Sequence, residues 1–151
     1  MKMFLPLFLA FACVPIAGSR EPRENAPRGS ESRAFGEVEI LTPTNGVDFT
    51  AYVKELYDKV LRKWYATMPE SVVLGEKGKI VVRFRIIPDG KLQENELTVE
   101  SASGKGQLRR LSIEAINASS PFKPLPKAFD GPYIELRFIF LYNLPVSAAK
   151  P

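Results

Sequence analysis

Residues 78–92 read GKIVVRFRIIPDGKL, and this stretch decides the fold. From Lys79 onward the residues have the period of two that is typical of a β-strand with one buried face. The face predicted to be buried consists of Ile80, Val82, Phe84 and Ile86. Pro88-Asp89-Gly90 has the composition of a turn, because proline presets φ and glycine accepts a positive φ. Alternation resumes at residues 97–100, so the sequence predicts a β-hairpin with one face in water.

Apolar residues recur at three- and four-residue spacing on both sides of this hairpin, which is typical of helices with one buried stripe. The stripe before the hairpin consists of Phe49, Val53, Leu56, Val60 and Trp64. The stripe after it follows a loop at residues 101–106 and consists of Leu108, Leu111, Ala115 and Ile116. The sequence therefore predicts one helix before the hairpin and one after it.

The strongest strand pattern is the last one, at residues 133–142, where apolar residues occupy every second position. The preceding PFKPLP at residues 121–126 excludes regular structure but carries apolar side chains, so we expect it to pack against the core. The order helix, strand, strand, helix, strand predicts an α+β fold. We expect a small three-stranded antiparallel sheet with two helices packed on one face. Such a sheet has exposed edges, which are templates for docking another strand.

The N-terminus has the features of an export signal. Lys2 supplies a positive charge, residues 3–18 carry no charge, and small residues precede a cleavage site after Ser19. We therefore expect residues 1–19 to be a cleaved signal peptide. The alternatives are an uncleaved anchor, although this stretch is shorter than the roughly 20 residues that span a bilayer, and a lipoprotein acylated at Cys13.

Composition divides the remainder of the chain into three parts. Residues 20–35 interleave arginine and glutamate with proline, glycine and serine, so they are predicted to be a disordered linker. Residues 36–143 contain all the periodic segments and are predicted to form one domain. Residues 144–151 are expected to be a flexible tail.

The chain contains no histidine and a single cysteine, which excludes much catalytic chemistry. There is no imidazole base, no histidine-ligated zinc and no intramolecular disulfide. A carboxylate pair or a Ser103–Lys105 dyad are the alternatives left, and both lie in ordinary loop sequence. We predict a protein that is not an enzyme and has no cofactor and no metal site.

Two other binding classes are disfavoured by charge and size. Residues 36–151 carry 16 basic and 14 acidic side chains, which is not the footprint of a nucleic-acid-binding protein. A carrier of an apolar ligand would need a larger cavity than three strands and two helices provide. A protein-binding domain is the class that remains.

Six elements follow one another in a fixed order between residues 78 and 142. They are GKIVVRFRIIPDGKL, the SASG loop, LRRLSIEAI, PFKPLPKAF, Gly131 and YIELRFIFLY. Together they resemble the C-terminal domain of the TonB and TolA energy-transducer family. The resemblance implies structural roles for the motif positions Asp89, Gly90, Ser103, Gly104, Pro121, Phe122, Leu125 and Pro126.

The resemblance also implies a function. It implies a non-enzymatic periplasmic protein-interaction domain in a bacterial cell envelope, which supports transmembrane transport. The partners implied are an outer-membrane receptor segment or an inner-membrane complex, docked by strand addition. A stand-alone exported adaptor or lipoprotein with no energy-transducing role is the alternative, and so is a membrane-anchored chain that faces the periplasm.

The docking edge implied by the resemblance is the last strand. Its outward residues Tyr133, Glu135, Arg137 and Ile139 are the predicted partner-binding side chains. The same edge offers an alternative use, a homodimer through the edge strand.

Overall fold

The structure is a computed structural model that describes residues 34–150. The expected signal peptide at residues 1–19, with Cys13, and nearly all of the expected linker lie outside the described residues. The strands are β1 (Ala34–Ile40), β2 (Gly78–Ile86), β3 (Thr98–Ala102) and β4 (Ile134–Tyr142). The helices are α1 (Thr50–Ala66), α2 (Glu70–Val73), α3 (Gly106–Ser119) and the 3-10 helix η1 (Val146–Ala149).

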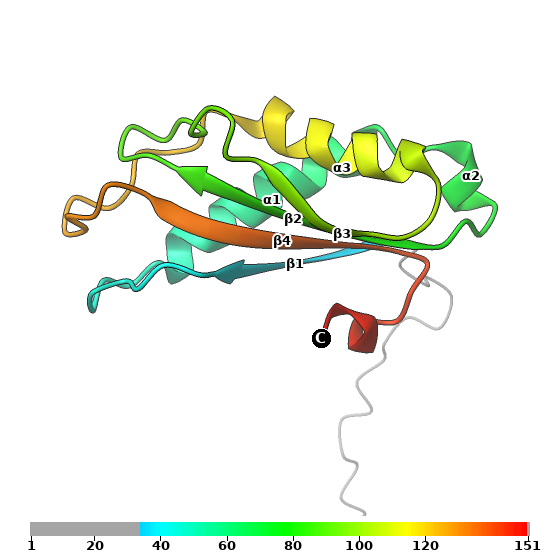
Figure 1. Ribbon diagram of the computed structural model, residues 1–151, viewed down its shortest axis with the longest axis horizontal. Coiled ribbons are helices and arrows are strands. Elements are labelled where there is room, and N and C mark those ends of the chain that lie inside the picture. The colour runs from blue at the N-terminus through cyan, green and yellow to red at the C-terminus, as the bar shows by residue number, and fades with distance from the viewer. Residues whose placement is uncertain (1–33, 151) are drawn as a thin grey trace, which may run out of the picture.

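The strands form one antiparallel sheet in the order β1-β4-β2-β3, and α1 and α3 pack on the same face of it (Figure 1). The predicted α+β class, antiparallel sheet and two covering helices are confirmed. The strand count is corrected, because the described sheet has four strands and not three. The added strand, β1, begins at Ala34, inside the segment that was expected to be linker.

The core lies between the sheet and the two long helices. Alternate residues of β2 and β4 point into it, and Trp64 of α1 is fully buried against Phe140 and Tyr142. The Trp64 Nε1–H donates to the Tyr142 hydroxyl over 2.7 Å, and that hydroxyl lies 2.8 Å from Ser112 Oγ on α3. One buried hydroxyl thus connects both helices to β4, and burial raises the pKa of Tyr142.

The tail departs from its prediction. Residues of η1 lie on the second face of the sheet, where Ala149 packs on Val81, Ile139 and Leu141. These three sheet residues are apolar side chains on the face that was expected to be in water, and η1 removes them from solvent. The prediction of a flexible tail was therefore wrong for residues 146–149.

The motif residues of the Pro-Asp-Gly turn and the PFKPLP segment contact each other. The Phe122 N–H donates to the Gly90 carbonyl over 2.8 Å, and the Leu125 N–H donates to the Pro88 carbonyl over 3.0 Å. Phe122 and Leu125 are buried, as expected for a segment that packs on the core. Gly90 has a φ of +91°, and a Cβ there would overlap the Phe122 carbonyl oxygen.

The SASG loop is held by a second set of motif contacts. The Lys79 N–H donates to Ser103 Oγ over 2.8 Å, and the Ser103 N–H donates to the Lys79 carbonyl over 2.8 Å. Gly104 has a φ of +92°, and a Cβ there would lie 2.8 Å from the Lys77 carbonyl oxygen. The loop thus joins the start of β2 to the start of α3.

The Gly90 contact predicts a large effect of a small substitution. Gly90→Ala adds backbone strain and a steric overlap, so we expect a loss of at least ~3 kcal/mol in the free energy of unfolding. Gly46→Ala is the matched control, because Gly46 has a φ of +80° with nothing within 4 Å of the added Cβ. The control should lose only about 1 kcal/mol. Urea denaturation measures both, and equal losses would contradict the proposed overlap.

Candidate protein-interaction surface

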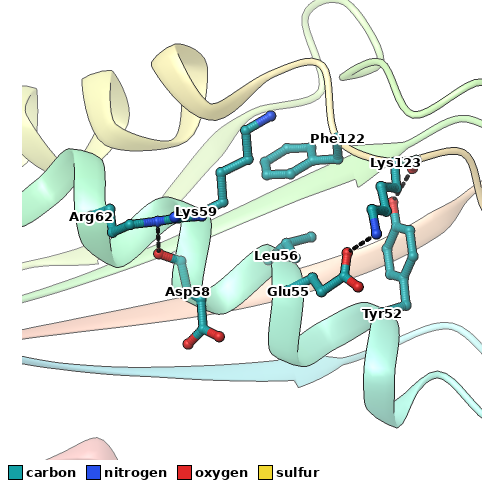
Figure 2. A pocket seen from close by; sticks show the side chains of 8 residues that line it. All are labelled: Tyr52, Glu55, Leu56, Asp58, Lys59, Arg62, Phe122 and Lys123. Atoms are coloured by element: carbon teal, nitrogen blue, oxygen red, sulfur yellow. Dashed lines mark hydrogen bonds and ion pairs between the residues drawn. The ribbon is translucent and has the colours of Figure 1, made fainter.

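A hollow of about 330 Å³ lies between α1 and the segment that follows α3 (Figure 2). Its polar groups serve to join these two segments. The Tyr52 hydroxyl donates to the Lys123 carbonyl over 2.8 Å, Lys59 Nζ donates to the Pro121 carbonyl over 2.6 Å, and Lys123 pairs with Glu55. Burial raises the pKa of Tyr52 to about 12, so its hydroxyl stays protonated at neutral pH. These contacts in the hollow therefore join α1 to the segment that follows α3.

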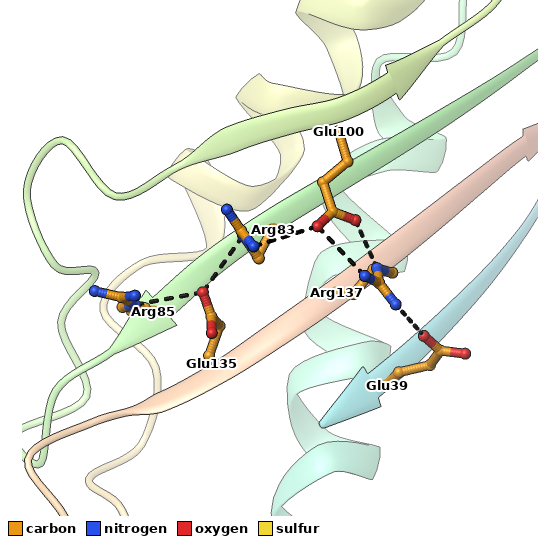
Figure 3. A network of polar contacts seen from close by, with 6 residues as sticks. All are labelled: Glu39, Arg83, Arg85, Glu100, Glu135 and Arg137. Carbon is orange, nitrogen blue, oxygen red and sulfur yellow. Dashed lines mark hydrogen bonds and ion pairs between the residues drawn. The ribbon is translucent and has the colours of Figure 1, made fainter. Parts of the chain in front are cut away.

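Charged side chains cross the other face of the sheet in a continuous row (Figure 3). Arg137 Nε lies 2.6 Å from Glu100 Oε2, and Arg137 Nη1 lies 3.1 Å from Glu39 Oε2. The row continues through Arg83, 3.5 Å from Glu100, to Glu135, which also pairs with Arg85 at 3.4 Å. This charge ladder, as we call it, consists of Glu39, Arg137, Glu100, Arg83, Glu135 and Arg85.

The arginines and glutamates of the charge ladder pair with one another. Its three arginines and three glutamates face each other, and Arg85 also pairs with Glu96 at 3.2 Å, so each of its arginines is paired with a carboxylate. The hydrogen bond from Arg137 lowers the pKa of Glu100, followed by the charges of Arg137 and Arg83. Because these side chains remain partly exposed to water, which screens their charges, each pair adds little to stability. The ion pairs occupy the charged side chains of the open face. The backbone groups at the sheet edges are then the groups that a partner strand can bond.

The predicted docking edge is corrected by the sheet order. β4 lies between β1 and β2 and pairs with both along its length, so the last strand is not an edge. Glu135 and Arg137 belong to the charge ladder, and Ile139 is covered by η1. Tyr133 precedes β4 and lies under the Arg85 guanidinium, 4.4 Å from ring centre to Cζ. The four side chains share the open face, but β1 occupies the edge they were expected to define.

The described sheet has its two edges at β1 and β3. β3 is five residues long, and its register with β2 shifts between Val81 and Val82. Short strands and bulges protect an edge from pairing. β1 is seven residues long and runs in unbroken register with β4 from Ala34 to Ile40. β1 is therefore the better template for strand addition.

The backbone of β1 can be divided into bonded and outward groups. The Leu41 N–H donates to the Glu135 carbonyl over 2.8 Å, which makes Leu41 and Glu135 a hydrogen-bonded pair. In an antiparallel pair such as β1 and β4, hydrogen-bonded residue pairs alternate with pairs that are not hydrogen-bonded to each other. Glu37 and Glu39 therefore bond to β4, whereas the N–H and C=O of Val38 and Ile40 point outward. The Gly36 carbonyl also points outward, where it accepts a bond of 2.8 Å from the Tyr57 hydroxyl. No described residue bonds the outward groups of Val38 and Ile40.

The structure places the two residues of the candidate Ser103–Lys105 dyad in a loop and at the start of a helix. Ser103 Oγ bonds to the Lys79 backbone, and Lys105 is the exposed residue that precedes α3. Between residues 34 and 150, no three histidine, cysteine, aspartate or glutamate side chains form a group that could hold a metal ion. In the same range, no helix combines the length and apolar character that a membrane crossing requires.

The sheet has one helix-covered face, an ion-paired open face and an edge whose outward groups at Val38 and Ile40 no described residue bonds, which is an arrangement that protein-interaction domains use for strand addition. The comparison with known families then gives its family. The family described as TonB C terminal matches residues 49–138, which is more than half of the chain. The chain belongs to this family, as the resemblance predicted. The family is one of envelope protein-interaction domains of the TonB type.

Two NMR solution structures of the Helicobacter pylori TonB C-terminal domain are similar to the chain. The longer form is 22% identical, with a TM-score of 0.45, and the match covers 68% of this chain and 89% of that one. The shorter form is 20% identical, with a TM-score of 0.48, and the match covers 60% of this chain and 91% of that one. No curated protein matches the chain.

The charge ladder predicts a sign-dependent effect at its central arginine. Arg137→Gln should lower the free energy of unfolding by less than about 1 kcal/mol, because exposed pairs contribute little. Arg137→Glu places a third carboxylate between Glu39 and Glu100 and should cost more. Urea denaturation at low and high NaCl concentration measures the free energy of unfolding of both variants. High salt should reduce the difference between the two values. A gap that salt leaves unchanged would contradict the electrostatic explanation.

The alternation along β1 predicts a pattern of amide protection. The amides of Glu37 and Glu39 should exchange with solvent more slowly than those of Val38 and Ile40, by a factor on the order of 100. Hydrogen exchange followed by NMR measures each amide separately. Similar rates at all four positions would show that the assignment of outward groups is wrong.

Proposed function

We propose that this chain is a periplasmic docking module of the TonB type that captures a segment of an envelope protein by strand addition to β1. Family membership supports the general role, and the sheet order supports the edge. The observation that carries the proposal is the row of outward N–H and C=O groups at Val38 and Ile40, which a partner strand can bond.

The partners proposed are a segment of an outer-membrane receptor or a protein of an inner-membrane complex. Strand addition suits them because the affinity comes from backbone bonds and the choice of partner from side chains. The proposed role is non-enzymatic and supports transport across the envelope.

The location of the module depends on residues 1–19. We propose that they are a cleaved signal peptide, which makes the mature chain a free periplasmic adaptor. Retention of this segment, or acylation of Cys13, would make it a membrane-anchored chain that faces the periplasm. The mass of the native N-terminus distinguishes the three forms, and a mature chain that begins near Arg20 is the expected result.

A proline at an outward position tests the docking edge directly. Val38→Pro removes the outward N–H and leaves the bonds of Glu37 and Glu39 to β4 in place, as prolines on edge strands do. We expect Val38→Pro to lose capture of envelope proteins from a membrane extract by at least ~10-fold, since it removes one of the few docking bonds. Quantitative mass spectrometry of the captured proteins measures the loss.

Two further variants make this experiment decisive. Val38→Ala loses the same side-chain packing but keeps the N–H, so it should retain capture. Ile40→Pro removes the next outward N–H and should reproduce the loss if Val38→Pro folds poorly by circular dichroism. A folded proline variant that captures the same proteins as Val38→Ala would refute docking at β1.

A further inference from the structure

We infer that the outer edge of β1 accepts an extended segment in which basic and apolar residues alternate, and that it rejects a second copy of itself. This inference rests on the proposed docking edge and specifies the partner that fits it. The observation behind it is that the two side chains of β1 on the open face in mid-strand are both acidic, Glu37 and Glu39.

The two faces of β1 present different chemistry to an added strand. Val38 and Ile40 pack against the core cluster, and a Cβ at Gly36 would meet the Phe138 ring, so even-numbered positions face the helices. Glu39 reaches Arg137 across the opposite face, so odd-numbered positions face the charge ladder. An added strand therefore places alternate side chains beside Val38 and Ile40 on one face and beside Glu37 and Glu39 on the other.

Among residues 34–150, the acidic side chains of this edge have few cationic partners. Arg137 is the cation that pairs with Glu39, and it also pairs with Glu100. No described residue forms an ion pair with Glu37, and the Glu39 side chain remains 42% exposed. Opposite charges on directly facing cross-strand residues stabilise pairing, and like charges oppose it. A partner with lysine or arginine on this face supplies the missing counter-charge.

The same carboxylates disfavour pairing of β1 with itself. In a two-fold antiparallel pair centred on Val38, Glu37 of each copy lies opposite Glu39 of the other copy. A centre at Glu37 or at Glu39 places that residue opposite itself. These three registers bring carboxylates face to face, which disfavours each of them in an edge-to-edge homodimer.

A pair of peptides tests the partner chemistry. One alternates lysine and valine and the other alternates glutamate and valine, both capped and as long as β1. We expect the full-length chain to bind the lysine peptide at least ~10-fold more tightly at low salt, with the preference shrinking as salt rises. The formal net charge of +4 favours the acidic peptide by bulk attraction, so the expected order requires local recognition.

Two variants separate this inference from the docking proposal. Glu37→Gln should reduce the preference for lysine, and Val38→Pro should abolish binding of both peptides. Equal affinity for the two peptides, lost in Val38→Pro, would overturn the charge preference and leave docking at β1 intact. Binding that is unchanged in Val38→Pro, or no binding of either peptide, would overturn the docking edge and this inference with it.

Charge reversal tests the rejection of a second copy. In Glu37→Lys, each substituted side chain lies opposite Glu39 of the other copy in the register centred on Val38. Sedimentation equilibrium should show the native chain as a monomer at micromolar concentrations and Glu37→Lys as a dimer that the added Val38→Pro dissociates. A native dimer that Val38→Pro dissociates, or a Glu37→Lys chain that stays monomeric, would overturn the proposed role of the carboxylates.

Discussion

The structure depends on β4 being bonded on both sides. The backbone N–H and C=O groups of its even-numbered residues bond to β2, and those of its odd-numbered residues bond to β1. Its inward side chains form the floor on which α1 and α3 pack, and the hydroxyl of Tyr142 bonds to both helices. Its outward side chains anchor the charge ladder through Arg137 and Glu135. The two faces and both edges of the sheet are defined relative to this strand.

The hairpin, the two long helices and β4 could be predicted because each carries its pattern within its own residues. Apolar residues occupy every second position of β4, and the stripe of α1 recurs over four turns. β1 carries a weaker signal, since Glu37, Val38, Glu39 and Ile40 alternate over only four residues. Its partners lie about a hundred residues away in β4, its Glu39–Arg137 contact spans 98 residues, and its Gly36–Tyr57 contact spans 21. A pattern of four residues does not by itself identify a strand that such distant contacts stabilise.

The predicted docking edge was wrong in place for the same reason. The alternation of residues 133–142 identifies a strand, but whether a strand is an edge depends on what lies beside it. The four predicted side chains do share one face, but all four have partners in the charge ladder, in the contact between Arg85 and the Tyr133 ring, or in η1. Because β1 lies beside β4, the outward backbone groups of this edge belong to Val38 and Ile40, and the side chains beside them are Glu37 and Glu39.

The two edges of this sheet are protected by different means, and the difference bears on function. β3 is short and bulged, which weakens any ladder built on it. β1 is long and regular, so its backbone would pair with any extended chain if the side chains were neutral. In the proposed function its carboxylates restrict pairing by charge, while the backbone groups of Val38 and Ile40 bond the partner. An edge protected in this way would disfavour registers that place its carboxylates face to face and favour a strand of opposite charge, which is the property that a docking module requires.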